Sequence, residues 1–186
     1  FIEDNYALET RQHLVASDLG FSEPYWQTMA DLGWLGINVP EAHGGIGGNQ
    51  SDTMVLMQAL GQGLVLEPIF ASAILGTRAI VDGANEDTCT RLLPSLVSGE
   101  RRLSVAYAEE QARFDLDDVV TRITPQDDGY RISGRKSMVF HAQGSDYLVV
   151  SGRSYGGQTD RDGITLLLVD AASEGVRMTS FPTVDG

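Results

Sequence analysis

The stretch Val119-Val-Thr-Arg-Ile-Thr-Pro-Gln-Asp-Asp-Gly-Tyr-Arg-Ile-Ser-Gly-Arg-Lys136 decides the fold of this chain. β-Branched and aromatic residues occur on both sides of Asp128-Gly129, a pair that favours tight hairpin turns because Gly adopts a positive φ at little cost. We therefore predict two antiparallel strands, Val119–Thr124 and Tyr130–His141, joined by this turn.

Similar short runs continue through the second half of the chain. They are rich in β-branched and aromatic residues, and polar or Gly-rich turns separate them. Four further strands are predicted: Leu103–Ala108, Tyr147–Gly152, Ile164–Val169 and Val176–Phe181.

The first hundred residues show helical periodicity instead. Ser22-Glu23-Pro24 is typical of a helix start, with Ser as the cap and Pro in the first turn. Further helices are predicted at Asp52–Leu60 with Ser51 as cap, at Pro68–Val81, and from Asn85 until Pro94 kinks or ends the helix. A helical domain followed by an antiparallel β-barrel or sandwich is an α+β arrangement, and it lacks the βαβ alternation of a Rossmann fold.

Composition and charge narrow the function classes. The 186 residues are 42% apolar and 21% charged, as in an ordinary globular protein, and the formal net charge is −13. This acidity excludes a typical nucleic-acid binder, which needs clustered Lys and Arg. Only three of the 13 basic residues precede Glu100, so an anionic ligand is expected to meet the second half of the chain.

The cysteine content, the length of the apolar runs and the two chain ends bear on where the protein is located and whether the chain is part of a longer one. The single Cys89 excludes an internal disulfide and is compatible with a reducing compartment, so a cytoplasmic location is expected. No apolar run reaches the roughly 20 residues of a membrane span. The chain starts at Phe1 without Met and stops at Gly186 in a turn-like segment, so we expect it to be an interior piece of a longer protein.

Several motifs invite a chemical interpretation that their context does not support. Gly44-Gly-Ile-Gly-Gly48 follows no predicted strand and has no Lys or Arg nearby, so a flexible turn is favoured over a phosphate loop. Cys89 lies among polar helical residues and is not expected to act as a nucleophile. The three histidines lack a metal-ligand spacing, so no metal is predicted: His13, His43 and His141.

Charged residues of the second half leave two interpretations open. Adjacent carboxylates such as Glu109-Glu110 point to opposite faces of a strand, so they are expected to be solvated strand ends and turns. The basic residues either balance nearby acids or form an anion-handling face. They are Arg101, Arg102, Arg113, Arg122, Arg131, Arg135 and Lys136.

Taken in order, the motifs resemble the acyl-CoA dehydrogenase family. The likeness rests on a Gly-rich stretch between helices and on later segments in both halves, and it covers nearly the whole chain. The segments that resemble the family as a whole are Leu32–Gly48, Leu92–Gly99, Gly129–Lys136 and Ser145–Arg153. The segments most similar to pimeloyl-CoA dehydrogenase small-subunit-type members are Ala106-Tyr-Ala-Glu109, Arg113-Phe-Asp115, Asp160–Asp170 and Pro182–Gly186.

The resemblance implies a domain plan and an activity. Residues 1–100 would form the N-terminal helical domain and residues 101–186 the middle β-domain, while the C-terminal four-helix domain of the family is absent. In the family, FAD lies between the last two domains, and a carboxylate base removes the α-proton of an acyl-CoA as flavin takes the β-hydride. That base lies on the absent helices in the main branch, so no catalytic residue is expected in this chain.

The resemblance also implies which residues face the flavin. The family's Thr-Glu-Pro-Gly-x-Gly-Ser-Asp segment falls on Ala108–Asp115, and its Trp-Ile-Thr segment falls on Met138–Phe140. Side-chain hydroxyls are absent at Ala108, Phe114 and Phe140, but backbone N–H groups can serve as donors. The expected cofactor contacts are Tyr107, Ala108, Glu109, Phe114, Met138, Val139 and Phe140, and the expected substrate contacts are Arg113 and Phe114.

The absence of the family's side-chain hydroxyls at Ala108, Phe114 and Phe140 leaves two functions open. The first is an FAD-dependent acyl-CoA dehydrogenase, with a dicarboxylyl-CoA such as pimeloyl-CoA as a candidate substrate. The second is a flavin-free, non-catalytic small subunit of a hetero-oligomer. The family implies homo- or hetero-oligomers with another acyl-CoA dehydrogenase chain and an electron-transfer flavoprotein or similar acceptor.

Overall fold

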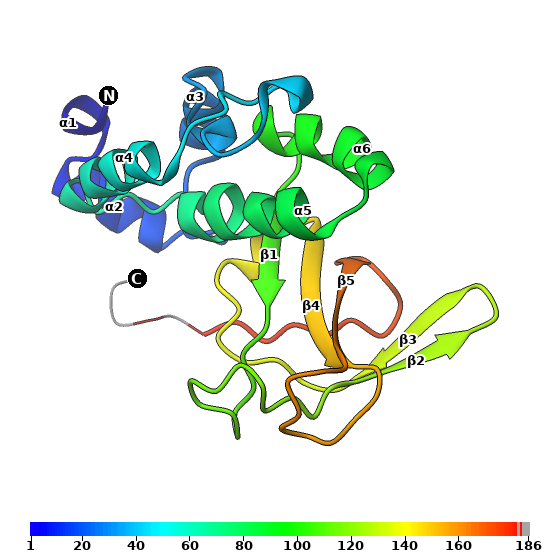
Figure 1. Cartoon of the computed structure of the whole chain (residues 1–186). Helices are drawn as coiled ribbons and strands as arrows, with labels where there is room; N and C mark the ends of the chain where they lie inside the picture. The colour runs from blue at the N-terminus through cyan, green and yellow to red at the C-terminus, as the bar shows by residue number, and fades with distance from the viewer. Residues whose placement is uncertain (182, 184–186) are drawn as a thin grey trace.

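The computed structural model describes residues 1–181 and 183. The helices gather at one end of the molecule and the strands at the other, as Figure 1 shows. The helical part holds α1 (Ile2–Asn5), α2 (Leu8–Val15), α3 (Glu23–Asp31), α4 (Gln50–Gln62), α5 (Thr77–Gly83) and α6 (Glu86–Val97), with the π-helix η3 (Ile69–Gly76) and the short 3₁₀ turns η1 (Trp34–Gly36) and η2 (Glu41–His43). The predicted order of a helical half followed by a β half is confirmed.

Helix starts follow local capping chemistry. The hydroxyl of Ser22 accepts a hydrogen bond from the Tyr25 N–H at 3.2 Å, and the side chain of Asn85 accepts one from the Thr88 N–H at 2.9 Å, so both predicted caps are confirmed. The expected cap Ser51 is wrong. Asn49 caps α4 instead, because the carboxylate of Asp52 reaches back to the Asn49 N–H at 2.8 Å and completes a capping box.

Two helical predictions change in detail. The segment 68–81 forms the π-helix η3 followed by α5 rather than one α-helix. Pro94, expected to kink or end the helix before Ser98-Gly99, does not end α6, which continues to Val97 and stops just before Ser98 as expected. Pro94 lies on the exposed face, while Leu93 and Leu96 keep the opposite face buried, and this packing holds the helix past the missing N–H.

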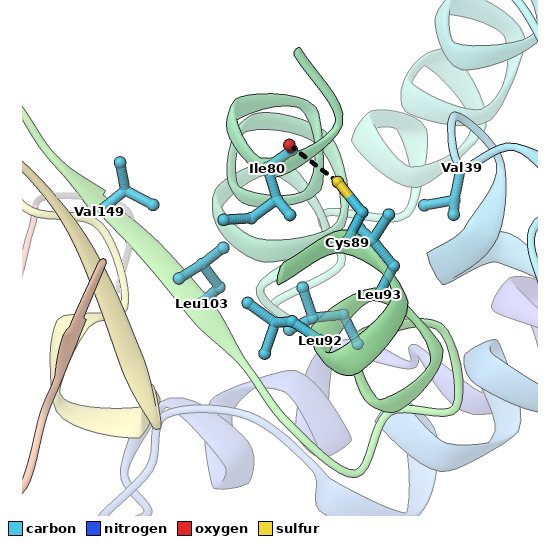
Figure 2. Packing of buried hydrophobic residues seen from close by; sticks show 8 residues of the cluster. Val39, Ile80, Cys89, Leu92, Leu93, Leu103 and Val149 are labelled. Atoms are coloured by element: carbon cyan, nitrogen blue, oxygen red, sulfur yellow. Dashed lines mark hydrogen bonds between the residues drawn. The ribbon is translucent and has the colours of Figure 1, made fainter. Parts of the chain in front are cut away.

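One hydrophobic cluster joins the helical part to the strands. Figure 2 shows Ile80 of α5 and Cys89 of α6 on one side of it, and Leu103 and Val149 of the strands on the other. The expectation of a polar setting for Cys89 is wrong: the side chain is 6% exposed, and its Sγ lies 3.5 Å from the Ile80 carbonyl oxygen. Helix periodicity turns Cys89 inward although its sequence neighbours are polar.

The strands form one five-stranded sheet centred on β4. Its members are β1 (Leu103–Ala106), β2 (Arg122–Gln126), β3 (Gly129–Ser133), β4 (Tyr147–Arg153) and β5 (Ile164–Asp170). The hairpin turn is confirmed, because β2 pairs antiparallel with β3 through Gln126 and Gly129, and this hairpin projects from the sheet in Figure 1. The sheet is mixed rather than antiparallel, because β1 and β2 both pair in parallel with β4.

Several expected strand bounds are wrong. The strand expected over 103–108 stops at Ala106, the one expected over 119–124 runs from Arg122 to Gln126, and the one expected over 130–141 runs from Gly129 to Ser133. No strand forms over 176–181. After Ser133 the chain leaves the hairpin and bonds elsewhere, because the Ser137 N–H donates to the Ala108 carbonyl at 2.9 Å. The β-propensity of residues 134–141 could not predict this change of partner, because propensity does not determine which neighbouring segment a strand pairs with.

Candidate functional site

The loop that connects β1 to β2 carries most of the expected site. β5 pairs along β4 from Tyr147 to Arg153, so β1 and β2 share the opposite edge of β4. The chain between them, residues 107–121, leaves the sheet and returns to the same edge. We call it the 107–121 loop.

The two segments expected to contact flavin lie side by side. The Ser137 N–H donates to the Ala108 carbonyl at 2.9 Å, and the ammonium of Lys136 donates to the Tyr107 carbonyl at 3.3 Å. Residues 107–109 and 136–138 are therefore neighbours although more than 25 positions separate them in the sequence.

Glu109 is the central side chain of this contact. It is 2% exposed, and its Oε1 lies 2.6 Å from Lys136 Nζ. Its carboxylate also accepts the N–H groups of Val120 at 2.8 Å and Thr121 at 3.1 Å, and the side-chain amide of Gln111 at 2.9 Å. The expectation that Glu109 is a solvated strand end is therefore wrong, because these four donors replace the water that burial removes.

Lys136 is equally well satisfied. Its ammonium donates to Glu109, to Ser151 Oγ at 2.8 Å and to the Tyr107 carbonyl, which uses all three of its protons. Burial acting alone would raise the pKa of Glu109, but the Lys136 hydrogen bond and the other donors outweigh it and lower that pKa to about 2. Burial also lowers the pKa of Lys136, against the opposing effect of Glu109. Glu109 is thus ionised near neutral pH.

The other residues expected to contact flavin in these two segments have apolar side chains, and most have backbone N–H groups that are unpaired among the described residues. The side chains of Tyr107, Met138 and Phe140 are 42–50% exposed, while Ala108 and Val139 are half-buried. The N–H groups of Ala108, Glu109, Met138, Val139 and Phe140 donate to no other residue in the described part of the chain.

Arg113 and Phe114 lie farther along the loop. Phe114 is 99% exposed, and Arg113 is exposed with a positive φ of 53°. Arg113 forms no hydrogen bond or ion pair with any other described residue.

The basic residues divide between the two interpretations. Arg101 pairs with Asp146 at 2.8 Å, Arg102 pairs with Glu23 at 3.4 Å, and Lys136 pairs with Glu109, as charge balance predicts. Four others are exposed, and the anion-handling interpretation stays a prediction for them: Arg113, Arg122, Arg131 and Arg135.

Two buried charged residues had no signal in the sequence. Arg153 at the end of β4 is 0% exposed, and its guanidinium donates to the backbone carbonyls of Asp117, Val119, Gln158, Asp160 and Asp162. It therefore fixes the end of the 107–121 loop against the turn between β4 and β5. Glu67, 5% exposed, accepts the Ser22 N–H at 3.1 Å, and burial raises its pKa.

The other motifs stay structural. Gly44–Gly48 forms a turn in which the Gly47 N–H donates to the Val39 carbonyl at 2.8 Å. Burial raises the pKa of the Cys89 thiol, which disfavours a reactive thiolate. Among the residues that the structure describes, no helix has the length and apolar character to cross a membrane.

The family is decided by comparison with known domains. Residues 1–100 match the acyl-CoA dehydrogenase N-terminal domain, and residues 104–186 match the acyl-CoA dehydrogenase middle domain. This chain belongs to the acyl-CoA dehydrogenase family.

Individual relatives of this acyl-CoA dehydrogenase chain are distant. It is 31% identical over 167 residues to the L-prolyl-[peptidyl-carrier protein] dehydrogenase of Pseudomonas fluorescens, covering 86% of this chain and 43% of that protein. It is also similar to the solved "Tcur3481-Tcur3483 steroid ACAD G363A variant", with 30% identity, a TM-score of 0.81, and coverage of 94% of this chain and 46% of that one.

A third likeness concerns the fold alone. The chain is 24% identical to the ChsE4-ChsE5 complex from Mycobacterium tuberculosis, with a TM-score of 0.83 and coverage of 97% of this chain and 46% of that one. The chain spans less than half the length of these proteins.

Proposed function

We propose that this chain forms the N-terminal and middle parts of an FAD-dependent acyl-CoA dehydrogenase, which converts an acyl-CoA to the trans-2-enoyl-CoA. One observation carries the proposal. The two segments that the family resemblance assigns to flavin are adjacent, and their backbone N–H groups at Ala108, Glu109 and 138–140 have no partner among the described residues.

The residues present fit a flavin. A flavin ring needs hydrogen-bond donors for its polar edge and an apolar surface for its face, and backbone N–H groups supply donors without any side-chain hydroxyl. Tyr107, Met138 and Phe140 supply apolar surface beside those donors. Residues 107–109 and 138–140 would hold the cofactor, and FAD, when bound, accepts the hydride from the acyl β-carbon.

The chain's own residues bind and orient in this proposal rather than transfer protons. Glu109 is the buried carboxylate of the site, but four donors already saturate its oxygens. A general base must reach the proton that it removes, and Glu109 faces Lys136 and the loop instead. The catalytic base is therefore not assigned to this chain.

Flavin content tests the proposal. The natural full-length protein is purified and its ratio of bound flavin to protein is measured, followed by dye-coupled oxidation of acyl-CoA thioesters. A ratio near one and formation of the 2-enoyl-CoA support the proposal. A colourless protein that takes up no FAD on reconstitution contradicts it.

A second candidate is a flavin-free small subunit that completes the site of a catalytic partner. Ala108 and Phe114 replace the Thr and Ser of the family's flavin segment, and the solved steroid relative is named for two components, Tcur3481 and Tcur3483. Co-purification with a larger acyl-CoA dehydrogenase chain would support this candidate. A stable homo-oligomer that is active by itself would exclude it.

Arg113 is proposed to recognise the free carboxylate of a dicarboxylyl-CoA, the substrate class that the pimeloyl-type resemblance suggests. Its guanidinium is exposed and has no partner among the described residues, so it is available to an anion. Arg113→Ala should reduce the preference for dicarboxylyl over monocarboxylyl thioesters, whereas Arg131→Ala on the hairpin should not. An unchanged preference in Arg113→Ala would remove this role.

Two partners complete the proposal. The acyl-CoA site would be finished by another acyl-CoA dehydrogenase chain or domain, and electrons would leave to an electron-transfer flavoprotein or similar acceptor in the cytoplasm. Size-exclusion chromatography and reduction of a purified acceptor by the loaded enzyme test these two points.

A further inference from the structure

The peptide between Tyr107 and Ala108 has a fixed orientation. Its carbonyl accepts a hydrogen bond from Lys136 Nζ at 3.3 Å and lies 3.4 Å from Ser151 Oγ, so it points toward the sheet. Described peptide bonds are all trans, and in a planar trans peptide the C=O and the N–H point in opposite directions. The N–H of Ala108 therefore points away from the sheet.

The next peptide is oriented in the same way. The Ala108 carbonyl accepts from the Ser137 N–H at 2.9 Å, which turns the Glu109 N–H away from the 136–138 segment. The N–H groups of Ala108 and Glu109 thus remain without partners among the described residues. In each of these two peptides the carbonyl is hydrogen-bonded to residue 136 or 137, so the N–H points the other way.

The carboxylate of Glu109 closes the same loop. It accepts the N–H groups of Val120 and Thr121, so residue 109 near the start of the 107–121 loop is bonded to residues at its end. Lys136 binds this carboxylate and the Tyr107 carbonyl with one ammonium group. One ion pair therefore sets both the closure of the loop and the orientation of its first peptide.

The ion pair itself has no capacity left for a ligand. All three protons of Lys136 and four acceptor positions of Glu109 are used inside the protein, and the two side chains are 8% and 1% exposed. Any effect of the pair on a ligand must pass through the backbone that it orients.

We propose that Glu109 and Lys136 are positioning residues, which orient the Ala108 N–H group toward the bound flavin. This inference rests on the proposed function for its ligand, but the orientation of the loop can be measured without flavin. Neither residue is a catalytic residue, because neither side chain contacts cofactor or substrate directly.

The test uses variants of the natural full-length protein. Removing one partner would leave a buried unpaired charge, so the pair is replaced together as Glu109→Gln with Lys136→Met. The matched control is Arg78→Met with Asp82→Asn, which removes an exposed ion pair on α5. Amide hydrogen exchange of residues 107–121 is measured without flavin, and the FAD dissociation constant is measured by titration.

The expected result has two parts. Amide exchange over 107–121 should accelerate in the buried-pair variant and not in the control, and FAD should bind about tenfold or more weakly, which corresponds to one lost hydrogen bond. A folded buried-pair variant with unchanged exchange and unchanged FAD affinity overturns the inference. If the unmodified protein binds no FAD, the proposed function fails, and exchange over 107–121 alone decides whether the pair positions the loop.

A milder variant keeps the inference testable if the double variant does not fold. Ser151→Ala removes one partner of Lys136 and one neighbour of the Tyr107 carbonyl, and leaves both charges in place. We expect its melting temperature to fall by several degrees, because one buried proton of Lys136 loses its acceptor, and FAD to bind about threefold more weakly, a fraction of one hydrogen bond. Unchanged FAD affinity in this variant overturns the inference.

Discussion

Lys136 Nζ lies 2.6 Å from Glu109 Oε1 in a buried ion pair that spans 27 positions of sequence. The two residues belong to segments that the sequence connects only through the β2–β3 hairpin and the rest of the 107–121 loop. Their pairing brings the loop and the 136–138 segment together, so the pH and mutational behaviour of the protein should depend on it.

Acid should weaken the fold through Glu109. The pKa of this carboxyl is lowered to about 2 in the folded chain, against 4.5 for the free group. A group with a lowered folded pKa stabilises the fold above its unfolded pKa, and this stability is lost as pH falls from about 4.5 to about 2. Urea midpoints over this range should fall less steeply for the Glu109→Gln, Lys136→Met variant. Parallel curves would contradict the role of Glu109.

Glu67 should have the opposite dependence. Burial raises its pKa, and its Oε2 has no partner among the described residues, so ionisation at higher pH costs stability. Glu67→Gln keeps an acceptor for the Ser22 N–H and removes the ionisable group, so its stability relative to the unmodified protein should rise by about 1 kcal/mol from about pH 4 to about pH 8. The gain should vanish below about pH 4, where the glutamate is protonated.

The control for this measurement is Glu110→Gln. Glu110 is exposed, so its replacement should change the urea midpoint little at either pH. Equal effects of Glu67→Gln and Glu110→Gln near pH 8 would show that burial of Glu67 carries no cost.

Arg153 should be a principal support of the loops at the end of the sheet. Its guanidinium donates to five backbone carbonyls with no exposure to solvent. Arg153→Lys keeps the charge but cannot reach all five acceptors, so we expect a loss of about 3 kcal/mol from carbonyls left without donors. Chemical denaturation measures it.

The matched control is Arg161→Ala. Arg161 pairs with the side chain of Asp117 at 3.2 Å, but it is 91% exposed, and an exposed pair contributes about 0–1 kcal/mol. If Arg153→Lys is as mild as Arg161→Ala, the carbonyl contacts do not stabilise the loops.

Gly45 should tolerate no side chain. A Cβ at this position would overlap the carbonyl group of Val39, so Gly45→Ala should cost about 3 kcal/mol as an overpacked backbone contact. Gly83 at the end of α5 has open space, so Gly83→Ala should instead stabilise by about 0.5–1 kcal/mol. Melting temperatures that shift in the same direction for both variants would refute this contrast.

Features that depend on nearby residues were predictable. The caps Ser22 and Asn85 bond to N–H groups three residues away, and the turn at Asp128-Gly129 closes a hairpin of adjacent strands. The local errors arose where two candidates lay close together, as with Asn49 and Ser51 at the start of α4. There the carboxylate of Asp52 accepts the Asn49 N–H, which makes Asn49 the cap.

Features that depend on distant residues were not predictable. The parallel pairing of β1 with β4, the inward turn of Cys89 and the burial of Arg153 each require partners more than eight positions away. Nothing in a run of alternating residues says which strand edge it will join or which way it will run.

The sequence by itself determined the acyl-CoA dehydrogenase family and the order of a helical part before a β part, and it predicted which segments would face a flavin. Only the tertiary structure decided what those segments present. It buried Glu109 against Lys136 and turned the Ala108 carbonyl inward, which left backbone N–H groups in place of the missing hydroxyls. The physical reason is range: capping and turn bonds form between near neighbours, whereas a buried charge must find its partner wherever the packed chain brings one.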